Sequence, residues 1–173
     1  MATLVTQQTS KTSSLGLSAA DAVWVATALL HQSNPKKPGF LTADIVAEVI
    51  RRKLTDTQER TIYQHVTQHC VANREPKPNR PRMLLALGQG IRRLWIPGDK
   101  EDPNRAGAPF RPEAANLPEE FLPLLKWYKT EFMPKMRPNN KVEDPLLALI
   151  GHGKHTWADE HADEYVRRLR EEW

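Results

Sequence analysis

The sequence predicts an α+β protein, and three observations carry that prediction. Apolar residues recur at helical spacing in three stretches before residue 72. Two apolar runs of six residues, at 82–87 and 91–96, then flank a short loop with two glycines, as in a β-hairpin. The chain has 173 residues, of which 39% are hydrophobic and 27% charged, so it has room for one ordinary domain with appendages rather than two full cores.

Three helices are expected before the hairpin, because each stretch begins at a residue that can cap a first turn. The third helix would turn Ile62, Val66, His69 and Cys70 toward the core. The predicted spans are 18–32 with a cap at Ser18, 42–53 with a cap at Thr42, and 55–72 with a cap at Thr55 or Asp56.

A small antiparallel sheet completes the predicted domain. The loop Gly88-Gln89-Gly90 joins the two runs of the hairpin, and the short extended piece Phe40-Leu41 would be the third strand. Helix, short strand, helix, helix and hairpin is the order of a winged helix-turn-helix domain. We therefore expect such a domain over residues 18–99.

The remaining chain is divided by prolines and by a loose Ser/Thr-rich start. We expect a helical segment with an apolar stripe from Phe121 to Phe132, in which Pro123 either lies in the first turn or begins a separate helix. Whether the last helix docks on a partner or on its own domain stays open at this stage. The predicted divisions are a flexible N-terminus at 1–17, a linker at 100–117, the helical segment at 118–133, and a proline-containing linker with an amphipathic tail at 134–173.

Composition narrows the class of protein. The single cysteine, Cys70, excludes an internal disulfide framework and a Cys-based zinc site, and fits a reducing compartment. No apolar run approaches the roughly 20 residues of a membrane span. The first residues lack the charged and apolar regions of a secretory signal. We expect a cytoplasmic protein without a membrane partner.

Catalytic motifs are absent from the sequence. It has no glycine-rich phosphate loop followed by Lys-Ser/Thr, no G-x-S-x-G, no H-E-x-x-H and no paired cysteines. The cluster His152, His155 and His161 has ligand types for a metal, but Gly151 and Gly153 beside it make a flexible loop. We expect a non-enzymatic protein with no cofactor and no metal site.

Charge is distributed unevenly along the chain. Residues 1–100 carry 14 Lys and Arg against 7 Asp and Glu, whereas residues 101–173 carry 11 against 14. A basic half fits a polyanionic partner. Within it, six basic residues surround the hairpin and would hold phosphates of double-stranded DNA or reach its minor groove: Arg74, Lys77, Arg80, Arg82, Arg92 and Arg93.

The third helix of a winged helix-turn-helix enters the major groove, so its outward side chains would read the bases. None of those outward residues is acidic. Glutamine can pair with adenine and arginine with guanine in a bidentate way. A protein-protein adaptor remains the alternative, since a polar exposed helix face looks similar without DNA. The predicted base-reading residues are Thr57, Arg60, Thr61, Gln64, Thr67 and Gln68.

Three motifs of the predicted domain carry a resemblance to a known family. They are His-Cys-Val-Ala-Asn at 69–73, Asn-Arg-Pro-Arg-Met-Leu at 79–84, and Arg-Arg-Leu-Trp-Ile-Pro-Gly-Asp at 92–99. On these motifs, residues 19–99 resemble a family of prokaryotic winged-helix domains of poorly defined function. The resemblance implies the fold and association with DNA, as in a transcriptional regulator or a DNA-reading accessory module of a restriction or other defence system.

The C-terminal part, with Asp-Pro-Leu-Leu-Ala-Leu at 144–149 and Glu-Tyr-Val-Arg-Arg-Leu-Arg at 164–170, has a second resemblance. It is similar to the tails of antitoxins encoded beside PIN-domain ribonuclease toxins, where the tail wraps the toxin and an arginine can occupy its acidic site. These antitoxins usually carry a smaller dimeric DNA-binding domain, so a homodimer stays open here. The resemblance implies Arg167, Arg168 and Arg170 as the inserted candidates, and Trp157, Tyr165, Val166, Leu169 and Trp173 as apolar anchors.

Overall fold

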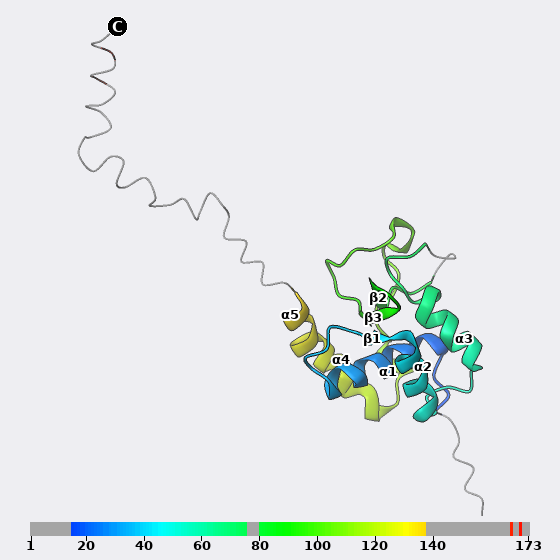
Figure 1. Cartoon of the computed structure of the whole chain (residues 1–173). Helices are drawn as coiled ribbons and strands as arrows, with labels where there is room; N and C mark the ends of the chain where they lie inside the picture. The colour runs from blue at the N-terminus through cyan, green and yellow to red at the C-terminus, as the bar shows by residue number, and fades with distance from the viewer. Residues whose placement is uncertain (1–14, 76–79, 138–166, 168–169, 171–173) are drawn as a thin grey trace, which may run out of the picture. The chain divides into compact units, whose positions relative to one another are not determined.

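The computed structural model describes residues 15–75 and 80–137, together with the positions 167 and 170 (Figure 1). The predicted α+β class is confirmed, with a three-stranded antiparallel sheet packed among helices. The helices and strands are α1 (Ala19–Ser33), β1 (Phe40–Leu41), α2 (Thr42–Arg51), α3 (Glu59–Gln64), the π-helical turn η1 (His65–His69), β2 (Leu84–Gly88), β3 (Ile91–Leu94), α4 (Leu122–Trp127), the π-helical turn η5 (Tyr128–Phe132) and α5 (Met133–Met136). Short 3-10 turns at Pro103–Arg105, Ala114–Asn116 and Glu119–Phe121 precede α4.

Helix α1 is the centre of the core. Ser18 caps it as expected, because the Asp21 backbone N–H donates to Ser18 Oγ at 3.1 Å. Residues 21–28 are all buried. A helix that is buried on nearly every side needs apolar residues all round, and the sequence Ala-Val-Trp-Val-Ala supplies them.

The sheet has the order β1-β3-β2. The hairpin predicted at 82–87 and 91–96 is shorter in the structure, and the loop is reduced to Gln89 and Gly90. A register shift between Ala86 and Gly88 leaves Leu87 as a bulge. Phe40-Leu41 is the third strand, as predicted, and its approach requires Gly39, since a Cβ there would lie 2.8 Å from the Arg92 carbonyl oxygen.

The third helix begins later and ends earlier than predicted. Thr55 Oγ1 is within 3.0 Å of Thr57 Oγ1 and accepts from the Thr57 N–H, so these side chains form a turn before α3. The helix then widens into η1, where the Cys70 N–H donates to the His65 carbonyl at 2.9 Å. Val71 already bridges to Leu84.

Residues 97–136 belong to the same core as the first three helices. The stretch expected as a linker buries Arg105 and Leu117. Trp24 of α1 meets the Tyr128 ring edge-on, with the ring centroids 5.5 Å apart. Pro123 lies in the first turn of α4, which begins separately at Leu122 after a 3-10 turn. The described structure therefore places residues 17–132 around one apolar core, rather than separating them near residue 100.

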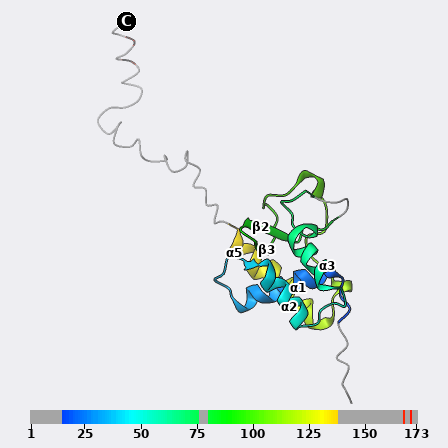
Figure 2. The ribbon, with the colours of Figure 1, turned by 45° about the vertical axis from the view of Figure 1, so that its right-hand side comes forward.

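In Figures 1 and 2, α3 lies at one edge of the domain and α5 at the opposite edge. No helix among the described residues is long and apolar enough to cross a membrane.

Candidate nucleic-acid interface

The outward face of α3 and η1 is where the sequence predicts it. Arg60, Gln64 and Gln68 are exposed, and Thr57, Thr61 and Thr67 are half-buried. The Thr67 hydroxyl donates to the Tyr63 carbonyl at 2.8 Å, so it is occupied by its own helix. Three long polar side chains without an acid among them are therefore available on this face.

The C-terminal end of η1 is closed by three arginines, which we call the arginine cap: Arg74, Arg92 and Arg105. The last four carbonyls of a helix have no partner within it, and cations are favourable beside them. Here all four accept from guanidinium groups. The bonds run from Arg92 Nε to Val66 O (3.3 Å), from Arg74 Nη1 to Thr67 O (2.9 Å), and from Arg105 Nη2 and Nη1 to Gln68 O and His69 O (2.8 Å each).

Arg105 is the most buried member of the cap, at 1% exposure. It also donates to the Pro81 carbonyl at 2.7 Å and to the Arg74 carbonyl at 2.9 Å. Its partners are backbone oxygens, and burial lowers the pKa of its guanidinium. One side chain thus ties the end of η1 to the chain on both sides of residues 76–79.

Sequence reasoning missed Arg105 because it lies in a stretch without periodicity. The one local signal is the short turn before it, where Asp102 Oδ1 accepts from the Asn104 N–H at 2.9 Å. Such a turn predicts backbone direction but not burial.

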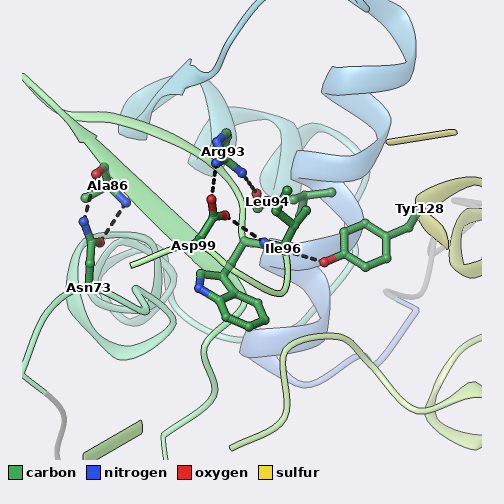
Figure 3. A network of polar contacts seen from close by, with 8 residues as sticks. Asn73, Ala86, Arg93, Leu94, Ile96, Asp99 and Tyr128 are labelled. Atoms are coloured by element: carbon green, nitrogen blue, oxygen red, sulfur yellow. Dashed lines mark hydrogen bonds and ion pairs between the residues drawn. The ribbon is translucent and has the colours of Figure 1, made fainter. Parts of the chain in front are cut away.

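The structure corrects the expectation for three of the predicted phosphate contacts. Arg92 is 3% exposed and faces inward, as part of the arginine cap. Arg82 forms an ion pair with Glu101 and lies 4.6 Å from the centre of the Trp95 ring. Arg93 Nη2 is 2.6 Å from Asp99 Oδ1 (Figure 3). These guanidinium groups hold the fold together rather than presenting free charge.

The other three predicted phosphate contacts differ in their exposure. Arg74 is exposed, although one of its nitrogens belongs to the cap, and Arg80 is half-buried. Lys77 lies outside the described residues. The basic surface beside α3 is therefore smaller than the sequence suggests.

The hairpin is fixed to both neighbouring helices. The Asn73 side chain pairs with Ala86 like a further strand, donating to its carbonyl and accepting from its N–H, each at 3.0 Å (Figure 3). At the other end, the Thr42 N–H and hydroxyl both donate to the Gly90 carbonyl, at 3.0 and 2.9 Å. Together with the bond from Arg92 to the Val66 carbonyl, these contacts hold the hairpin beside η1.

A histidine and a cysteine lie close together under this surface. His65 Nδ1 is 3.4 Å from Cys70 Sγ. Burial lowers the pKa of His65 to about 4 and raises the pKa of Cys70 to about 12, so the imidazole and the thiol are both neutral near pH 7. Among the described residues no group of three potential metal ligands gathers, and His152, His155 and His161 lie outside them.

The predicted partner-binding tail is described at two positions only. Arg167 and Arg170 are helical and exposed. The others of that set lie outside the described residues: Trp157, Tyr165, Val166, Arg168, Leu169 and Trp173.

The chain matches no model of a known protein family, no curated protein and no solved structure. Its class is therefore defined by the fold alone, an α+β protein with a helix face and a hairpin fixed side by side.

Proposed function

We propose that this protein is a non-enzymatic DNA-binding regulator, in which residues 18–99 form a winged helix-turn-helix. In this proposal α3 and η1 are the recognition helix, and β2 and β3 are the wing. The observation that carries it is the outward face of α3 and η1, which presents Arg60, Gln64 and Gln68 beside the fixed hairpin.

The chemistry of this face suits base edges. A glutamine amide both donates and accepts, which matches adenine N6 and N7 in the major groove. The Arg60 guanidinium can pair with guanine or with a phosphate. Glu59, the acid next to it in sequence, lies in the first turn of α3, where a negative charge is favourable.

The arginine cap supports the same proposal from inside the domain. Side chains that read bases must be held in a fixed place, because a small displacement breaks bidentate geometry. The cap joins η1 to β3 and to the segment around Arg105, so the helix cannot turn independently of the wing.

The test is the sequence preference of the full chain. Duplexes enriched from a randomised pool should bind the wild-type chain more tightly than unselected duplexes. The double variant Gln64→Ala, Gln68→Ala should lose about 1–3 kcal/mol of that preference for each glutamine–base contact that it removes. Its binding to unselected duplexes should stay unchanged. Gln32→Ala, an exposed glutamine of α1, is the matched control. A double variant that keeps the full preference would refute this placement of the recognition helix.

A second candidate is a protein-protein adaptor, and one observation favours it. Between α2 and α3 lies an open groove of about 480 Å³, lined by Ala43, Val46, Ala47, Ile50 and Tyr63 among others. Ile50 and Tyr63 are about half exposed, at 45% and 53%. Apolar grooves of this kind accept an amphipathic helix. The adaptor predicts no binding to duplex DNA even at low salt.

The antitoxin-like part of the proposal rests on the resemblance of residues 144–170. Exposed Arg167 and Arg170 agree with a tail that inserts an arginine into an acidic site. We expect the full chain to inhibit a PIN-domain ribonuclease encoded beside it, and Arg167→Ala with Arg170→Ala to weaken that inhibition. Equal inhibition by the double variant would remove these two arginines from the proposal.

A further inference from the structure

The open groove between α2 and α3 has an exposed apolar lining. The two helices lie side by side in both views (Figures 1 and 2). Val46 is the one buried residue of the lining, so the other side chains of both walls can be reached from outside. Ile50 on α2 and Tyr63 on α3 are among the most exposed large apolar side chains of the described residues. Apolar surface of this kind gains free energy when a partner covers it.

The two walls of the groove carry opposite charges at the same end. Arg51 is the last residue of α2 and Glu59 is the first residue of α3, and both line the groove. The Glu48 carboxylate accepts from both Arg51 and Arg52, so two guanidinium groups face one carboxylate and the α2 wall keeps a positive charge. Glu59 is exposed and forms no ion pair with the described residues. One wall therefore has a cation and the other an anion.

The two walls also differ in bulk one helical turn away from these charges. Ala47 lies four residues before Arg51, and residues at this spacing share a helix face. Tyr63 lies four residues after Glu59, again on the same face. Ala43 and Ala47 leave the α2 wall shallow, whereas the Tyr63 ring projects from the α3 wall. Each wall is thus complementary to the other in shape as well as in charge.

We propose that the α2–α3 groove is the interface of a two-fold symmetric homodimer. A two-fold axis along the groove exchanges its walls, so that α2 of each copy faces α3 of the other. Arg51 then meets the partner's Glu59, and Tyr63 packs over the partner's Ala47, and each contact occurs twice. A second copy of the chain supplies both complementary walls at once, which is why we assign the groove to it. The dimer needs no DNA and does not rest on the proposed function.

The experiment is sedimentation equilibrium of the full chain without DNA, at about 1 to 100 μM. We expect a reversible equilibrium between monomer and dimer for the wild type. Arg51→Glu and Glu59→Arg should each weaken the dimer at least about tenfold, because like charges then face each other. The combined variant exchanges the two charges and should restore association. A monomeric wild type over this range, or a combined variant as weak as the single ones, would overturn the proposal.

A second pair of variants tests the apolar part of the interface without touching an ion pair. Ile50→Gln should weaken the dimer by about tenfold, since it removes an apolar contact from the groove. Leu122→Gln, at an exposed leucine of α4, is the matched control and should leave association unchanged. Circular dichroism checks that each variant keeps its helices. Association that is unaffected by Ile50→Gln, or equally weakened by both changes, would place the contact elsewhere and overturn the assignment.

Discussion

Two buried nitrogen-bearing side chains, which lie in different parts of the domain, differ in their hydrogen bonding. Arg105, beneath the end of η1, donates to four backbone carbonyls. His31, at the end of α1, leaves a buried ring nitrogen unpaired within the described chain. Arg105 therefore has its hydrogen-bond partners within the chain, whereas His31 leaves one buried ring nitrogen without a partner among the described residues.

The largest expected loss of stability comes from substitution of Arg105. Arg105→Met removes a buried guanidinium that donates to four part-buried carbonyls, so the free energy of unfolding should fall by about 4 kcal/mol. Urea denaturation measures this, with Arg111→Met, an exposed arginine nearby, as the control. A loss below about 1 kcal/mol would show that the arginine cap is not what holds this end.

The buried imidazole of His31 should make the stability of the protein depend on pH. The pKa of His31 is about 4 in the folded state against an ordinary value of 6.5, so the unfolded chain binds the proton first as the pH falls. The free energy of unfolding should therefore fall between pH 6.5 and 4, by up to about 3 kcal/mol from this residue.

His31→Leu isolates this contribution. His65, with a pKa lowered to about 4 as well, remains in the variant, so the difference between the two curves belongs to His31. Unfolding should be measured by urea denaturation at several pH values. Parallel curves for the wild type and the variant would show that His31 does not titrate as described.

A smaller effect should appear where the two regions of the proposed DNA surface are joined. Asn73→Ala breaks the two hydrogen bonds to Ala86, so we expect a loss of about 1–2 kcal/mol in the free energy of unfolding. Asn104→Ala, in an exposed turn where the backbone of Asn104 makes the bond, should have little effect. Equal effects from both changes would mean that Asn73 does not hold the hairpin.

The regular elements were predictable because they follow simple periods. Ser18 as a cap, the hairpin around Gln89 and the strand Phe40–Leu41 all follow from local sequence. On α3 the helical wheel also placed Arg60 and Gln64 correctly on the exposed face. Here the residue's own neighbours in sequence decide its environment.

Irregular and charged positions were not predictable in the same way. Residues 97–117 have no period, so nothing in their pattern reveals that single side chains such as Arg105 and Leu117 are buried. Arg92 looks like a surface charge by composition. A signal was present nonetheless, because Arg92 and Leu94 are two positions apart on β3 and therefore lie on the same, buried face.

The most direct test of the central claim is a titration of the full chain against duplex DNA over a range of salt concentrations, beside Arg60→Gln. We expect binding that weakens steeply with salt, and a salt slope smaller by about one in the variant. Absence of binding at low salt, or an unchanged slope with unchanged affinity for the Arg60 variant, would contradict it.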